Sequence, residues 1–285
     1  MINRIDRVEM KFLVTAAQRA VLMERLDPHV RPDANGHDGP GYPIVSLYYD
    51  TAERDCHWEK VRGLGSRRKL RVRVYGSHDG RVPPVSFLEV KHKCDGRGVK
   101  RRVQLPIDVA LGVGGGLLPD GMNLSLADMR VIGEVHDLVA RRGFKPVMVM
   151  RYDRSAFASV DPAGDLRVTF DTGIFCRFDN LVPEPDDRRF HAANEMYPDG
   201  RAVMEVKITG CVPYWFSRMI SEAGCRLRSH SKYSNALAQC DPVLRAMLAP
   251  KFRPPAPVRT DGAIQRVHGD RAAAPGQGGG QVLAC

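Results

Sequence analysis

The feature that most constrains this chain is a repeated alternation of charged and apolar residues over short segments. Arg71 and Arg73 share one face of a predicted strand, whereas Leu70, Val72 and Val74 share the other face. Charged residues two positions apart recur elsewhere, in the pairs Glu9 and Lys11, Glu89 and Lys91, Lys100 and Arg102, and Glu205 and Lys207. A period of two predicts strands that have one buried apolar face and one charged face.

The alternation predicts eight strands, and hairpin signals with short links make them mostly antiparallel. They are expected at residues 4–13, 43–50, 67–75, 85–93, 99–105, 147–157, 165–171 and 201–209. Apolar residues at helical spacing predict helices at residues 15–26, 51–62, 125–142, 213–223 and 231–248. The predicted fold class is therefore α+β, with helices packed outside an antiparallel sheet. The glycine-rich run 112–116 lacks the Gly-Lys-Ser/Thr of a phosphate loop, and it is read as a flexible turn.

The charged strand faces predict an anion-binding cavity if the sheet closes into a barrel. Lysine and arginine outnumber aspartate and glutamate by 43 to 33, which favours an anionic partner. A closed barrel of about eight strands encloses side chains and one small ligand. Crowded cations in such a lumen repel one another unless an anion such as a chain of phosphates neutralises them. A solvated charged face remains the alternative at this stage.

Three glutamates, Glu9, Glu89 and Glu205, lie on the same predicted faces as the cations. A carboxylate beside a phosphate is repelled unless a divalent metal lies between them, and Mg²⁺ or Mn²⁺ binds both kinds of oxygen. Structural ion pairs with neighbouring lysines are the alternative reading of these glutamates.

Other features place the chain in a broad class. The seven cysteines form no Cys-x-x-Cys pair, which argues against a zinc site and a disulfide framework. We expect a cytoplasmic protein with reduced cysteines, because no secretory signal and no long apolar stretch is present. Proline and glycine dominate the end of the chain, so we expect a folded domain over residues 1–249 and a disordered tail over residues 250–285.

An ordered series of short motifs resembles a known family. The series includes Arg7-Val8-Glu9-Met10-Lys11, Leu70-Arg71-Val72-Arg73, Phe87-Leu88-Glu89-Val90-Lys91, Lys100-Arg101-Arg102, Tyr152-Asp153-Arg154, Met204-Glu205-Val206-Lys207 and Ser231-Lys232-Tyr233. It resembles the VTC domain, the catalytic domain of the vacuolar transporter chaperone polyphosphate polymerase. That domain is one of the triphosphate tunnel metalloenzymes, which are related to CYTH domains. The resemblance implies an eight-stranded antiparallel tunnel with helices outside.

The resemblance also implies an activity, which is metal-dependent transfer of the γ-phosphate of ATP to a growing polyphosphate chain. The residues implied to grip phosphate are Lys11, Arg71, Arg73, Lys91, Lys100, Arg154, Arg167 and Lys232. Glu205 is implied to bind the divalent metal, Mn²⁺ or Mg²⁺, and Glu9 and Glu89 are weaker candidates. The expected partners are ATP or another triphosphate and polyphosphate, but not nucleic acid, and any membrane partner is a separate protein. A triphosphatase of the same tunnel fold and a polyphosphate-binding module without activity remain alternatives.

Overall fold

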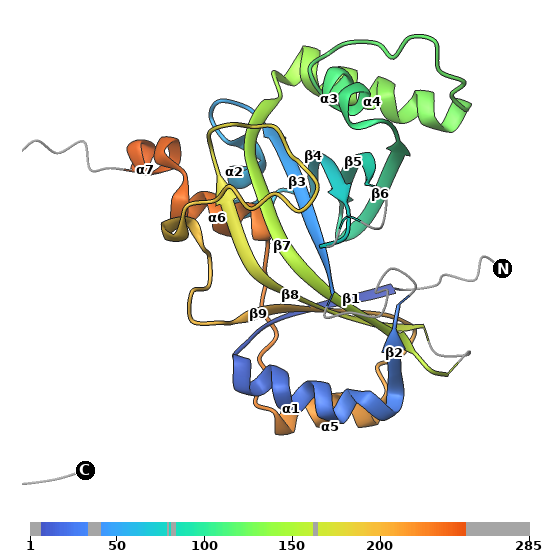
Figure 1. The fold of residues 1–285 in the computed structure, drawn as a ribbon, viewed down its shortest axis with the longest axis vertical. Coiled ribbons are helices and arrows are strands. Elements are labelled where there is room, and N and C mark those ends of the chain that lie inside the picture. Colours follow the sequence, from blue (N-terminus) through green and yellow to red (C-terminus); the bar gives the residue numbers. More distant parts are fainter. Residues whose placement is uncertain (1–6, 34–40, 79, 81–83, 162–164, 249–285) are drawn as a thin grey trace, which may run out of the picture. The chain divides into compact units, whose positions relative to one another are not determined.

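The computed structural model describes residues 7–33, 41–78, 80, 84–161 and 165–248. Its centre is one curled antiparallel sheet with the strand order β1-β9-β8-β7-β3-β4-β5-β6 (Figure 1). These strands are β1 (Arg7–Val14), β3 (Tyr42–Asp50), β4 (Ser66–Tyr75), β5 (Val85–Cys94), β6 (Arg97–Gln104), β7 (Lys145–Ser159), β8 (Leu166–Arg177) and β9 (Ala202–Thr209). The α+β class and the eight-stranded antiparallel sheet with helices outside it are confirmed. The predicted tail, residues 250–285, lies outside the described residues.

The sheet differs from the expected closed barrel in two respects. β1 and β6 stand at the two ends of the strand order, and no backbone pairing between them occurs in the part of the chain that the structure describes. Side chains from the two ends of the sheet nevertheless approach each other, since the Lys91 ammonium of β5 lies 3.8 Å from the Glu9 carboxylate of β1. A ninth strand, β2 (Val30–Pro32), pairs with the far end of β7 and was not predicted.

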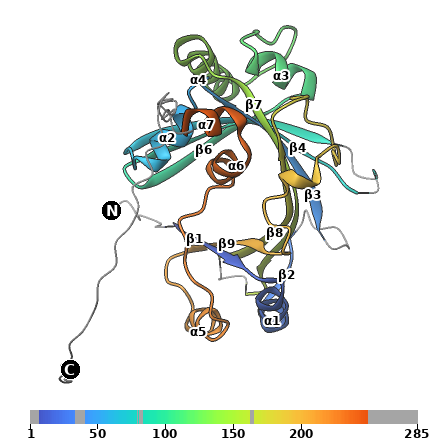
Figure 2. The ribbon, with the colours of Figure 1, turned by 90° about the vertical axis from the view of Figure 1, so that its left-hand side faces the viewer.

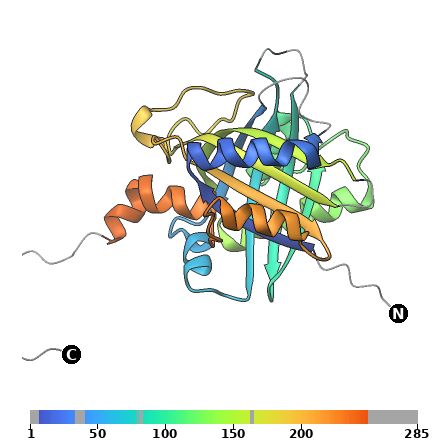
Figure 3. The ribbon, with the colours of Figure 1, turned by 90° about the horizontal axis from the view of Figure 1, so that it is seen from below.

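The apolar faces of the strands point outward and are covered by helices in two groups. The helices α1 (Ala16–Leu26) and α5 (Tyr214–Glu222) lie side by side over β1, β8 and β9 (Figure 3). Leu22, Leu26 and Phe216 are buried there against the strands. Thr15 forms a capping box with Gln18, which fixes the start of α1 where the sequence predicts it.

The second group covers β4, β5 and β6 with α3 (Ile107–Gly114) and α4 (Leu126–Arg142). Ser125 caps α4 at its start, and Gly143 ends it in the left-handed conformation at φ 68°. The reading of residues 112–116 as a flexible turn was wrong in its first half, because residues 112–114 form the last turn of α3. A Cβ atom added at Gly114 would overlap the Tyr49 hydroxyl, so glycine lets α3 approach the sheet closely.

The remaining helices are α2 (Asp55–Val61), α6 (Lys232–Cys240) and α7 (Pro242–Leu248). The single helix predicted over 231–248 is thus two helices, because Pro242 begins a new helix after the extended residue Asp241. No helix in the described part of the chain is long and apolar enough to cross a membrane.

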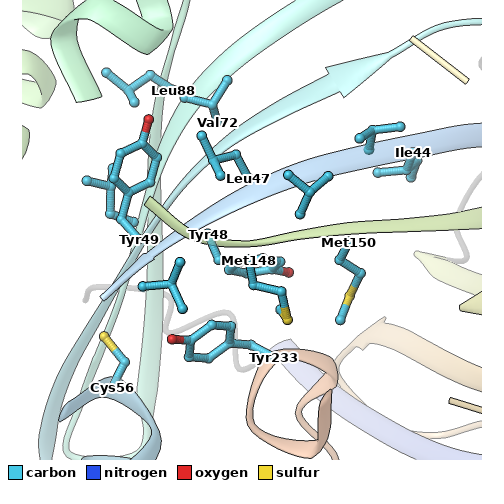
Figure 4. Packing of buried hydrophobic residues seen from close by; sticks show 14 of the residues in the cluster. Ile44, Leu47, Tyr48, Tyr49, Cys56, Val72, Leu88, Met148, Met150 and Tyr233 are labelled. Atoms are coloured by element: carbon cyan, nitrogen blue, oxygen red, sulfur yellow. The ribbon is translucent and has the colours of Figure 1, made fainter. Parts of the chain in front are cut away.

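The helix α6 lies within the curve of the sheet (Figure 2). Its Tyr233 stacks on Tyr48 of β3 at 5.0 Å between ring centroids (Figure 4). The Tyr233 hydroxyl also donates a 2.5 Å hydrogen bond to the buried Asp50. These contacts fix the N-terminal turn of α6 against the concave face. The neighbouring residue, Lys232, is thereby directed into the space that the sheet encloses.

Candidate functional site

The concave face of the sheet lines a cavity of about 1370 Å³. Fifteen lysine and arginine residues line this cavity, against four acidic residues. The structure brings together all eight cations that the resemblance implies, namely Lys11, Arg71, Arg73, Lys91, Lys100, Arg154, Arg167 and Lys232. Such an excess of positive charge in a partly enclosed space suits a polyanionic ligand.

Strand β4 supplies two of the most buried cations. The Arg71 guanidinium lies 2.6 Å from the Glu89 carboxylate and donates to the Tyr48 hydroxyl at 3.2 Å. Arg73 is only 6% exposed, and it donates to the Ser46 hydroxyl at 3.2 Å and the Tyr152 hydroxyl at 2.9 Å. No described carboxylate forms a salt bridge with Arg73, so its charge is left for a ligand to neutralise.

A buried carboxylate on β8 organises two further cations. Asp171 is fully buried, and it accepts hydrogen bonds at 2.7 and 2.8 Å from Arg154 of β7 and another from Lys232 of α6. Burial raises the pKa of Asp171, but Arg154 and Lys232 outweigh burial and lower it to about 2. Asp171 therefore stays ionised and holds both cations at the cavity wall.

The carboxylates of Glu9 and Glu205 both approach the ammonium group of Lys11. Lys11 lies 2.7 Å from Glu9 and 3.9 Å from Glu205, and Lys207 lies 2.9 Å from Glu205. Burial raises the pKa of Glu205, yet Lys207, Lys11 and Lys232 lower it well below the usual range. Burial and the charge of Glu205 raise the pKa of Glu9, but Lys11 and Lys91 hold it below its usual value. Two ionised carboxylates that already share a cation provide oxygen ligands of the kind that Mg²⁺ or Mn²⁺ prefers, and one or two carboxylates beside phosphate oxygens are the usual protein contribution, so these residues fit the implied metal.

Glu89 fits a metal less well. Its carboxylate is 1% exposed and is bound by Arg71 at 2.6 Å and by Lys100 at 3.3 Å. Burial raises the pKa of Glu89, but Arg71, Arg73 and Lys100 lower it far below its usual range. This carboxylate therefore belongs to an ion network that orients Arg71 and Lys100. In a similar way, Arg167 is oriented by Asp33, at 2.5 Å.

The site contains residues that the sequence analysis did not single out. Lys69 lies two positions before Arg71, so the same alternation could have identified it. Its ammonium donates to the Ser231 hydroxyl at 3.0 Å, and burial lowers its pKa to about 8. Burial raises the pKa of Tyr48, but Arg71 and other cations outweigh burial and lower it to about 8. A tyrosine hydroxyl with a lowered pKa reports the strength of the positive potential in the cavity.

A second group of possible metal ligands lies outside the cavity lining. His78 approaches Asp153 at 3.2 Å and Asp186 at 3.4 Å. Arg151 lies 2.8 Å from Asp153 and 3.0 Å from Asp186, and thus neutralises both carboxylates. We therefore regard this group as an ion network of the protein surface.

Comparisons with known proteins identify the family to which the chain belongs. No curated protein matches the chain. Among solved structures, the chain is similar to a "putative adenylate cyclase" from Bacillus halodurans, with 12% identity, a TM-score of 0.43, and coverage of 79% of this chain and 93% of that chain. A family model described as VTC domain matches residues 6–240, which include every strand of the curled sheet and the helix α6. The sheet with its cation-lined cavity is thus a triphosphate-tunnel fold, and the chain belongs to the VTC domain family.

Proposed function

We propose that this protein is a metal-dependent polyphosphate polymerase that transfers the γ-phosphate of ATP to the end of a polyphosphate chain. The observation that carries the proposal is the set of cations from β1, β4, β5, β6, β7, β8 and α6 that converge on one cavity. Among these cations, Arg73 and Lys69 give the strongest support for an anionic ligand, because neither forms a salt bridge with a described carboxylate. A bound polyphosphate supplies the missing negative charge.

The length of the lining favours a polymer over a single triphosphate. The cations on β4 begin at Arg67, and the lining extends to Tyr75. Eight residue steps along an antiparallel strand cover about 27 Å. A cavity of this length accommodates a donor triphosphate and an acceptor chain end to end, as phosphoryl transfer between two phosphates requires.

The chain's own residues contribute positioning and charge. The attacking group is a terminal oxygen of the acceptor polyphosphate, which is already ionised, so the reaction needs no protein base. Its electron pair forms a new bond to the γ-phosphorus, and the bond from this phosphorus to the bridging oxygen of the β-phosphate breaks, releasing ADP. Arg71, Arg73 and Lys232 offset the repulsion between the two anions and stabilise charge on the transferred group.

Glu205, assisted by Glu9, would hold the divalent metal. When bound, the metal supplies charge neutralisation and orients phosphate oxygens. Asp171 would keep Arg154 and Lys232 directed at the phosphates, since it bonds both side chains.

Product analysis tests the proposal directly. Purified protein is incubated with ATP and Mn²⁺, and the products are resolved on a polyphosphate-staining gel beside an assay of free phosphate. Polymer together with ADP is the expected result. Free phosphate without polymer would instead identify a triphosphatase, in which water replaces the acceptor phosphate. If folded protein yields neither product, the result would favour a binding module without activity.

A further inference from the structure

One end of the cavity carries a row of planar side chains. The row consists of Tyr42 on β3, Tyr75 on β4, Phe87 on β5 and Arg102 on β6, and we call it the aromatic end. Ring centroids of Tyr42 and Tyr75 lie 6.3 Å apart, and those of Tyr75 and Phe87 lie 5.8 Å apart. The Arg102 guanidinium lies over the Phe87 ring at 4.3 Å from its centroid, while the Arg102 side chain is exposed.

The opposite end of the cavity is chemically different. It contains Lys60 at the end of α2, Arg67 and Lys69 at the start of β4, and Lys93 near the end of β5, and we call it the basic end. The strand register separates the two ends, because Tyr75 pairs with Val85 whereas Arg67 pairs with Lys93. The ring of Tyr233, whose centroid lies 5.0 Å from the Lys69 ammonium, is 2% exposed and already stacked on Tyr48.

A nucleoside triphosphate has two different ends, as this cavity does, since a planar base stands at one end of the molecule and a polyanion at the other. Faces of aromatic rings and of arginine guanidinium groups stack on nucleic-acid bases. The buried Arg73 lies where the aromatic row meets the cations, and it donates to the Tyr75 hydroxyl at 3.5 Å. A base stacked on the row therefore directs its phosphates toward Arg73 and Arg71.

We propose that the aromatic end is the binding site for the base of the nucleotide donor, and that polyphosphate occupies the basic end. This inference rests on the proposed function and adds an orientation of the substrates to it. Tyr42 is only 7% exposed, so Tyr75, Phe87 and the exposed Arg102 guanidinium are the planar groups open to a base. Stacking on such groups tolerates different bases. ATP and GTP are therefore expected to serve alike as donors.

The test compares the affinity of ATP with that of inorganic triphosphate, which has no base. Both are measured by calorimetry on the wild-type chain and on the variants Arg102→Lys and Phe87→Leu. Arg102→Lys keeps the positive charge and removes the planar face, and Phe87→Leu keeps an apolar side chain and removes the ring. Each variant is expected to weaken ATP binding about fivefold or more, and to leave inorganic triphosphate within about twofold of wild type.

Lys93→Ala is the matched control at the basic end. It is expected to weaken binding of a long polyphosphate, and to leave the ratio of ATP affinity to triphosphate affinity unchanged. Triphosphate binding with an unaltered ratio in both aromatic-end variants would overturn the inference and leave the proposed function standing. Failure of inorganic triphosphate to bind the wild-type chain would overturn both.

Discussion

Replacing Asp171 by asparagine is expected to destabilise the fold and to make its stability depend more strongly on bound anions. Asp171 is fully buried and is the only described carboxylate within salt-bridge distance of Arg154 or Lys232. Asparagine keeps the size of the side chain but leaves two cations without a counter-charge. Removal of one partner from a buried ion network typically costs about 3–5 kcal/mol.

The pKa of Asp171 gives an independent magnitude. The difference between about 2 and the ordinary value of 3.8 corresponds to about 2 kcal/mol, at about 1.36 kcal/mol per pKa unit. Because the pKa is lower in the folded chain, this stabilisation is present above pH 3.8 and is lost as the pH falls through 2. We therefore expect Asp171→Asn to lose about 2–4 kcal/mol at neutral pH, and about half of the linked part to remain at about pH 3.

Urea denaturation of wild type and Asp171→Asn at pH 7, 4 and 3, with and without inorganic triphosphate, measures these quantities. Triphosphate should stabilise the variant more than wild type, because its oxygens replace the lost carboxylate beside Arg154 and Lys232. Asp199→Asn is the control, since Asp199 pairs with Arg201 at 2.7 Å on the surface, where ion pairs contribute little. A loss below about 1 kcal/mol, or an equal loss at pH 3 and pH 7, would refute the reasoning.

Three further predictions follow from the same site and its support. Glu205→Gln should keep the fold and lose metal-dependent turnover, because an amide binds Mn²⁺ or Mg²⁺ weakly; full activity would remove Glu205 from the metal site. Tyrosinate absorbance should show a transition near pH 8 that is absent in Tyr48→Phe and that moves upward when triphosphate neutralises the neighbouring cations; identical titrations of the two proteins would contradict this. Gly114→Ala should cost about 1–3 kcal/mol in thermal denaturation, since its Cβ overlaps the Tyr49 hydroxyl, and an unchanged melting temperature would contradict the close packing of α3.

The sheet could be predicted because its cause is local. Alternation along β4 places Leu70 and Val72 outward and Arg71 and Arg73 inward, and each assignment needs only neighbouring residues. Elements that depend on distant contacts were missed. The three-residue β2 is a strand only because it pairs with β7, and α3 is stable because it packs on β4 and β5.

The site shows the same division. Cations at alternate positions along a strand, such as Arg73 and Lys91, could be assigned to the cavity from the sequence. Lys69 follows the same alternation, although the sequence analysis did not select it. Asp171 did not stand out, because its partners come from β7 and α6 and no spacing along β8 reveals them. The position of α6 within the curve of the sheet depends on the contact of Tyr233 with Asp50. This position brings Lys232 to the cavity.

Four successive inward positions on β4 are cationic, from Arg67 through Lys69 and Arg71 to Arg73, so positive charge recurs about every 7 Å along the strand. A polyphosphate is a sequence of identical units. When such a chain advances by one unit, each cation loses one phosphate and meets an equivalent one, and the energy before and after the step is nearly the same. On the proposed function, the evenly repeated charge would therefore hold a polyphosphate against the strand while offering little resistance to its movement along the strand.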